Sequence, residues 1–126
     1  MTVKYNIVER GNPTNPTAPK KFYPSIQSSG RVTTRELAER AAQMSTLTTV
    51  DIMAAIESFL AIIPGELAKG NIVELGDFGS LWLRATSEGV DTVEEVNADQ
   101  ITGVLPRFTP GKVFKRVLET VKFNKN

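Results

Sequence analysis

Apolar and polar residues alternate at the start of the chain. Val3, Tyr5 and Ile7 are apolar, and the residues between them are polar. A period of two is typical of a β-strand with one buried face. Residues 11–19 hold three prolines within seven positions, which cannot continue a strand ladder, and an extended pattern resumes over residues 22–27. The pattern predicts an N-terminal β-hairpin with a long connection.

Helical spacing replaces this alternation after Gly30. A threonine cap precedes an apolar stripe that predicts a helix over residues 35–44. Thr48, with Asp51 three residues later, is a second capping signal, and apolar residues at helical spacing continue to Leu67. These residues cover most of the helix circumference, so the helix must be buried, and a chain of 126 residues offers little core for it. We therefore expect a dimer, and we expect Pro64 to kink or restart this helix.

Shorter elements are predicted in the second half of the chain. Gly76-Asp77 is a turn signal, and Thr92 can cap a short helix. The predicted elements are a short strand over residues 71–75, a strand over 78–86, a short helix over 92–100, a strand over 101–108 and a last helix over 112–121.

The composition excludes several kinds of chemistry. The chain has no cysteine and no histidine. Disulfides, thiolate catalysis, the usual general base at neutral pH and most zinc sites are therefore excluded. We expect no enzymatic activity, catalytic residue, metal, cofactor or small-molecule substrate. The longest apolar run, residues 59–64, is far shorter than the ~20 residues of a membrane span. The N-terminus lacks the pattern of a signal peptide. We therefore expect a cytoplasmic protein.

Charge is distributed unevenly along the chain. Residues 1–35 hold six basic groups against one acidic group, residues 36–100 hold three against twelve, and residues 101–126 hold six against one. Two basic ends around an acidic middle favour a polyanion partner that is met by the ends. A solvated surface of mixed charge would give the same pattern, and the charge alone does not decide between them.

The start of the predicted last helix is a candidate phosphate site. Pro110 is suited to a first helical turn, where free backbone N–H groups favour anions. The nearby cations are Arg107, Lys112, Lys115 and Arg116. Cations at a helix N-terminus oppose the helix dipole, so a bound DNA phosphate would offset that cost. Alternatively, the lysines simply solvate a short terminal helix.

Two segments resemble the bacterial histone-like HU/IHF proteins. Residues 73–81, Val-Glu-Leu-Gly-Asp-Phe-Gly-Ser-Leu, followed by Arg84, are similar to the strand–turn–strand of that family. Residues 105–112, Leu-Pro-Arg-Phe-Thr-Pro-Gly-Lys, resemble its F-x-P-G-K segment before the last helix. The order of the elements also matches. The resemblance covers residues 31–121 and leaves residues 1–30 outside, as in longer HU-related proteins with an N-terminal extension.

This resemblance implies an intertwined dimer with two β-arms that embrace the minor groove of DNA. Arg84 matches the family's arginine on the strand that leads into the arm, and Lys112 matches the lysine of F-x-P-G-K. The family's arm is basic and carries a proline at its tip, which wedges between base pairs. Here residues 85–100 hold five acidic residues, no basic residue and no proline. The acidic arm should be repelled by phosphates, so any DNA must be bound by the body, the last helix or the N-terminal hairpin.

We therefore predict an α+β fold. It is an HU/IHF-like intertwined dimer, with two helices, a three-stranded sheet with an arm and a C-terminal helix, preceded by an N-terminal β-hairpin. Residues 1–30 form the hairpin extension and residues 31–126 the DNA-binding domain. The predicted function is non-enzymatic, histone-like binding of double-stranded DNA in the bacterial nucleoid, through Arg84, Arg107, Lys112, Lys115 and Arg116. The alternative is a structural or protein-interaction homodimer whose acidic arm binds a basic partner.

Overall fold

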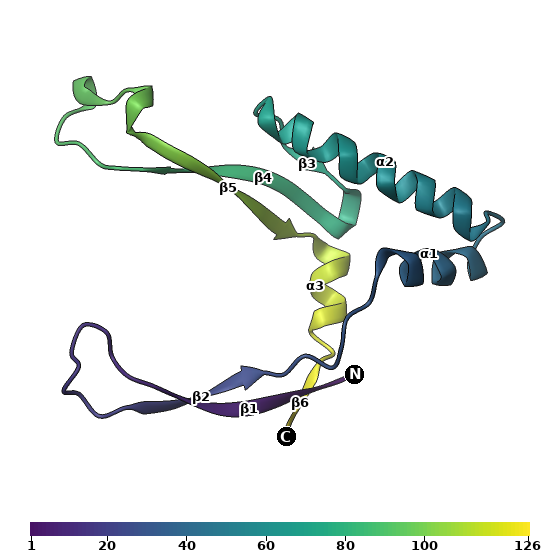
Figure 1. Ribbon diagram of the computed structural model, residues 1–126, viewed down its shortest axis with the longest axis horizontal. Helices are drawn as coiled ribbons and strands as arrows, with labels where there is room; N and C mark the ends of the chain where they lie inside the picture. The colour runs from purple at the N-terminus through teal and green to yellow at the C-terminus, as the bar shows by residue number, and fades with distance from the viewer. The chain divides into compact units, whose positions relative to one another are not determined.

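The computed structural model describes all 126 residues. It contains three α-helices and two three-stranded sheets, which confirms the predicted α+β class (Figure 1). The chain divides into two compact units. The first consists of Met1–Thr33 together with Val117–Asn126, and the second consists of Thr34–Arg116.

The first unit is built on the N-terminal hairpin. Strand β1 (Thr2–Arg10) pairs antiparallel with strand β2 (Lys21–Ile26), as the alternating pattern predicts. Strand β6 (Lys122–Lys125) lies parallel to β1 on its other side, so the sheet order is β2-β1-β6.

Strand β6 was not predicted. Helix α3 (Lys112–Leu118) ends before the expected residue 121, and the chain then extends along β1. The backbone N–H of Lys122 donates to the Met1 carbonyl at 2.9 Å, and the N–H of Asn126 donates to the Tyr5 carbonyl at 2.9 Å. A strand of four residues with a single apolar side chain has no periodic signal, so only the open edge of β1 makes this segment extended.

The second unit begins with helices α1 (Thr34–Gln43) and α2 (Thr49–Ala68). The predicted cap of α2 is present, because the Asp51 backbone N–H donates to the Thr48 hydroxyl at 3.2 Å and the Asp51 carboxylate accepts from Thr48 in return. Helix α2 continues through Pro64 as one element, so the prediction that the helix restarts there is wrong. Pro64 is exposed, and water can therefore satisfy the carbonyl that the missing N–H leaves free.

The second sheet has the order β3-β4-β5 and is antiparallel throughout. A short 3-10 turn, η1 (Gly76–Phe78), joins β3 (Val73–Glu74) to β4 (Gly79–Ser87). Strands β4 and β5 (Ile101–Pro110) form a long ribbon, with a register shift after Thr86. This ribbon and the residues that join its two strands form the arm.

The predicted short helix over residues 92–100 is wrong. Two separate 3-10 turns, η2 (Val93–Glu95) and η3 (Ala98–Gln100), stand in its place. Thr92 makes no side-chain cap hydrogen bond, and Asn97 is extended (φ −150°, ψ 173°) and begins a second capping box. The extended backbone at Asn97 interrupts any continuous helix.

Three phenylalanines connect α3 to the sheet. Phe78, Phe108 and Phe114 have ring centroids 5.1–5.4 Å apart, in tilted and edge-to-face arrangements. Such pairs stabilise packing beyond their buried area. They hold the start of α3 against η1 and the end of β5.

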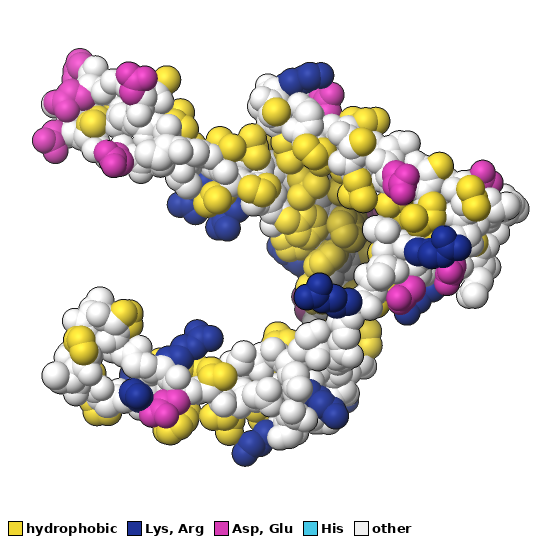
Figure 2. All heavy atoms as spheres, in the orientation of Figure 1, with side chains coloured by type: hydrophobic (Ala, Val, Ile, Leu, Met, Phe, Trp, Pro, Cys, Tyr) yellow, Lys and Arg dark blue, Asp and Glu magenta, His cyan; other side chains and the backbone are white.

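Little of the chain is buried. Only Ala38 and Leu67 are buried among the hydrophobic residues. Large side chains of α2 are exposed, including Val50 at 76% and Phe59 at 63%. Hydrophobic atoms accordingly gather beside α2 and at the base of the arm (Figure 2). An apolar surface of this extent indicates that another surface covers it.

Candidate nucleic-acid interface

The register of the arm brings two predicted site residues together. Trp82 lies opposite Arg107, and Arg84 lies opposite Leu105. Because side chains alternate along a strand, Trp82, Arg84 and Arg107 share one face of the ribbon. Leu81 and Leu83 point to the other face.

The face that carries both arginines contains no acidic residue along the paired strands. We call it the arginine face, and its residues are Ser80, Trp82, Arg84, Thr86, Gly103, Leu105, Arg107 and Thr109. Arg84 and Arg107 are exposed, and neither forms an ion pair, since the two ion pairs of the structure join Arg35 to Glu39 and Lys69 to Glu66. Their positive charge is therefore available to an anion in solution.

Trp82 is held in place on this face. Its indole N–H donates to the Thr109 hydroxyl at 2.7 Å, and the side chain is half-buried. This hydrogen bond links β4 to β5 near the base of the arm, where Thr109 lies opposite Ser80. Trp82 thus has a structural role within the arm, and its ring contributes an aromatic surface beside the arginines.

Two glycines allow the base of the arm to pack closely. A Cβ at Gly111 would overlap the Asp77 carbonyl, and the Gly111 N–H donates to the Phe78 carbonyl at 2.9 Å. A Cβ at Gly79 would lie 2.5 Å from the Thr109 carbonyl oxygen, and its φ of +148° also favours glycine. The glycines of the two motif segments therefore fix the fold near the arginine face.

The last helix differs from the prediction in a way that changes its electrostatics. Lys115 and Arg116 lie in the last turn of the seven-residue α3, where the helix dipole favours cations. The expectation that they oppose the dipole and need an anion is wrong for these two residues, because the helix ends at Leu118. Only Lys112 lies at the helix start. The strand register does not bring these three residues onto the arginine face.

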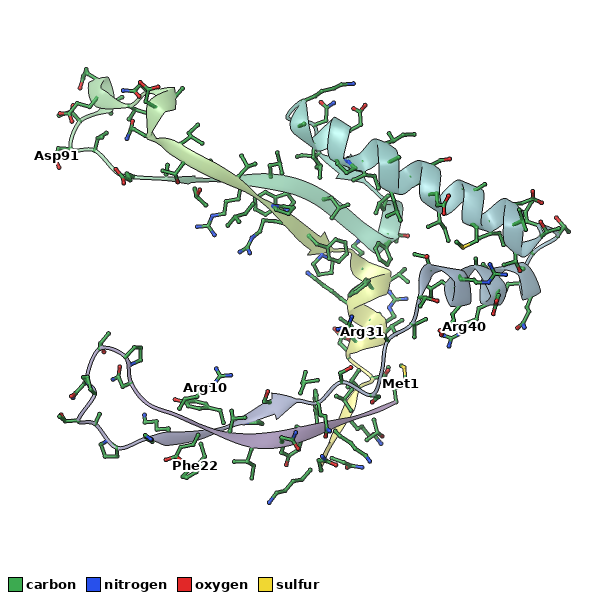
Figure 3. The ribbon with its side chains drawn as sticks, in the orientation of Figure 1. Met1, Arg10, Phe22, Arg31, Arg40 and Asp91 are labelled. Atoms are coloured by element: carbon green, nitrogen blue, oxygen red, sulfur yellow. The ribbon has the colours of Figure 1, made fainter.

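The opposite end of the arm is acidic. Its acidic residues are Glu88, Asp91, Glu94, Glu95 and Asp99. The Gln100 side-chain amide donates to the Glu88 carbonyl at 2.9 Å, which closes the end of the ribbon. Acidic side chains cover this far end in Figure 2, and Figure 3 places Asp91 there. No group of acidic residues in the structure is arranged to hold a metal ion.

The N-terminal sheet holds a basic pair that the sequence patterns did not single out. Arg10 and Lys21 lie directly opposite each other on β1 and β2. With Tyr23 they line a hollow of about 440 Å³ beside the loop that connects the strands. The signal in the sequence is that both residues flank a proline-rich loop without acidic residues, but only the strand register places them together.

A short strand, a glycine-containing turn, a long arm and a final helix joined by F-x-P-G-K define an HU-domain protein. The sequence pattern of the HU-HIG family, described as an HU domain fused to wHTH, Ig, or glycine-rich motif, matches residues 1–125. The chain belongs to this family. The match includes residues 1–30, whose strand β1 pairs with β6 at the end of the chain.

A solved structure shows the same fold. It is a crystal structure described as a putative bacterial DNA binding protein from Bacteroides vulgatus ATCC 8482. The two chains have a TM-score of 0.63 and 13% sequence identity over 98% of this chain. The match covers 47% of that protein, so the present chain spans about half of its length. No curated protein matches the sequence.

None of the three helices combines the length and hydrophobicity that a membrane span requires.

Proposed function

We propose that this chain binds double-stranded DNA through the phosphate backbone, with little sequence preference and without catalysing a reaction. The observation that carries the proposal is the arginine face, on which Arg84 and Arg107 are exposed, unpaired and free of acidic neighbours along the strands. Arginine forms paired hydrogen bonds to phosphate oxygens. The HU-HIG match and the fold shared with the Bacteroides vulgatus protein support the same function.

The acidic end of the arm limits how DNA can be held. Five carboxylates there repel phosphates, and the end of the arm has no proline to insert between base pairs. We therefore place the contact at the base of the arm, with Lys112, Lys115 and Arg116 adding positive charge from α3. Contacts of this kind position a protein on DNA and carry little sequence information.

We also propose that the chain acts as a homodimer. Helix α2 exposes Val50, Phe59, Leu60 and Ile62 over more than half of their surface, which a second copy of the chain would cover. The variant Phe59→Glu should sediment as a monomer and expose further apolar surface to a hydrophobic dye. A dimer that persists unchanged in this variant would contradict an interface through α2.

A direct test compares two double variants. We expect Arg84→Glu with Arg107→Glu to weaken binding to a duplex by about a hundredfold, because two phosphate contacts become repulsions. The matched control reverses Arg35 and Arg40 on α1 and should change affinity less than threefold. Fluorescence anisotropy with a labelled duplex, over a series of salt concentrations, measures both. Equal losses in the two variants would contradict the arginine face as the contact.

The second candidate function is a protein-interaction dimer in which the acidic arm binds a basic partner. It is favoured by the apolar side chains among the acidic residues, since Val93 is 84% and Val96 is 64% exposed. This function predicts no duplex binding even at about 50 mM salt. Duplex binding that disappears in the arginine-face variant favours DNA and a role in the bacterial nucleoid.

A further inference from the structure

The hollow in the N-terminal sheet is lined by two cations and by a loop of restricted conformation. Arg10 and Lys21 line it with Tyr23, at the end of the β1–β2 ribbon. The loop that forms the rest of the wall is held by an Asn12–Asn15 bridge, and the Thr14 backbone N–H donates to the Asn12 side chain at 3.0 Å. Three prolines further restrict this loop. The hollow therefore keeps its shape without a ligand.

The basic pair is unusual because nothing in the structure neutralises it. Two like charges directly opposite each other destabilise a strand pair. Arg10 and Lys21 form no ion pair, and the loop from residue 11 to residue 19 is uncharged. The neighbouring Glu9 lies opposite Phe22, on the other face of the sheet. Figure 3 shows Arg10 and Phe22 on opposite sides of the ribbon. An anion in the hollow would remove the repulsion between the two cations.

We propose that this hollow binds a phosphate group of the DNA backbone, as a second contact separate from the arginine face. This inference rests on the proposed function and adds to it. The guanidinium of Arg10 supplies a planar pair of donors, Lys21 a mobile charge, and Tyr23 a hydroxyl donor and an aromatic ring on the same hollow. This set of donors matches a phosphodiester, and no carboxylate that would repel it lines the hollow.

Two contacts on one chain have a consequence for affinity. The arginine face belongs to the second compact unit and the hollow to the first. If both units engage the same duplex, the second contact forms at a high effective concentration. Each added phosphate contact also makes binding steeper in salt, because further counterions are released. The salt dependence therefore reports whether the hollow is used.

The test uses the full chain and a labelled duplex. Arg10→Gln with Lys21→Gln removes the pair, and the control Lys4→Gln with Lys125→Gln removes the same charge from the same sheet at residues that do not line the hollow. We expect the slope of log affinity against log salt to fall by about 0.9 in the first variant, because one phosphate contact is lost. The control slope should change by less than about 0.5.

The outcomes separate this inference from the function on which it rests. If the wild-type chain binds no duplex at about 50 mM salt, both fail. If it binds, and the hollow variant and the control have the same slope, the proposed function stands and the hollow is overturned. Thermal unfolding should show the hollow variant as stable as the wild type or more so, since a repulsive pair is removed. Lys21→Gln alone should lower the slope in the same direction by less than the double variant does, and it serves if the double variant fails to fold.

Discussion

Each of the two units contains an antiparallel ribbon, but the cations lie at opposite ends of the two ribbons. In the β1–β2 ribbon the cations Arg10 and Lys21 lie beside the connecting loop, which has no acidic residue. In the β4–β5 ribbon the cations Arg84 and Arg107 lie toward the base, and the connecting segment is acidic. In the first unit, the cations that could bind a polyanion therefore lie at the loop end of the ribbon. In the second unit they lie at its base, although the backbone pairing is of the same kind. Pairing determines which residues share a face, and side-chain charge decides which part of that face can bind.

The ribbons also differ in how tightly they are packed. The base of β4–β5 is fixed against η1 and α3 by glycines and by three aromatic rings. At Gly11 in the first ribbon, by contrast, the nearest atom to an added Cβ would be 4.0 Å away. Substitutions of the same kind should therefore have different effects in the two units.

The largest effect is expected at Gly111. The variant Gly111→Ala places a methyl group against the backbone of Asp77, which cannot move without separating α3 from η1. We expect a loss of about 3 kcal/mol in the free energy of unfolding of the second unit. Urea denaturation followed by circular dichroism measures it. The matched variant Gly11→Ala should cost less than about 0.5 kcal/mol, and similar midpoints for the two variants would contradict the difference in packing.

A smaller loss is expected when the aromatic cluster is opened. Phe114→Ala removes two edge-to-face contacts from a half-buried site, at a cost of about 2 kcal/mol. The comparison is Phe123→Ala in β6, where the ring is 58% exposed and the cost should stay below about 1 kcal/mol. The same denaturation measurement applies. A larger loss at Phe123 would mean that the first sheet is the more tightly packed region.

Reversing the acidic end of the arm should strengthen DNA binding. Glu94→Lys with Glu95→Lys removes repulsion and should lower Kd about tenfold at about 50 mM salt, which is about 1.4 kcal/mol. The gain should shrink as salt rises, because exposed charges are screened. The control Glu39→Lys with Glu119→Lys makes the same change of net charge outside the arm and should have less than a threefold effect. Weaker binding by the arm variant would show that the acidic end takes part in the contact.

The smallest effect concerns the hydrogen bond between the strands of the arm. Trp82→Phe removes the bond to Thr109 at a cost of about 1 kcal/mol in stability. Thr109→Val should cost a similar amount, and the two changes together should cost less than their sum, because both remove one interaction. Thermal unfolding of the four proteins completes this cycle. Additive losses would show that Trp82 and Thr109 stabilise the arm independently.

Strong local patterns were read correctly from the sequence. The alternation over Val3, Tyr5 and Ile7 predicted β1, and the Thr48 and Asp51 pair predicted the start of α2. Both signals are local, since strand alternation and helix capping depend on residues a few positions apart. The strand–turn–strand and F-x-P-G-K segments pointed to the HU fold for the same reason.

Weak or ambiguous local signals led to the errors. Residues 92–100 contain a capping pattern, but Asn97 offers a second cap that divides the segment into two turns. Strand β6 carries almost no pattern of its own and is imposed by the edge of β1. The shortened α3 follows from this pairing and moves Lys115 and Arg116 from the first turns of a helix into its last turn.

The sequence by itself determined the fold class, the main strands and helices, and the separation of basic ends from an acidic middle, because each depends on composition or on neighbours along the chain. Only the tertiary structure decided which cations stand together. Arg84 and Arg107 are 23 positions apart, and strand register alone places both on one face. Arg10 and Lys21 meet across a ten-residue loop for the same reason. Register depends on pairing between distant segments, which no local pattern specifies.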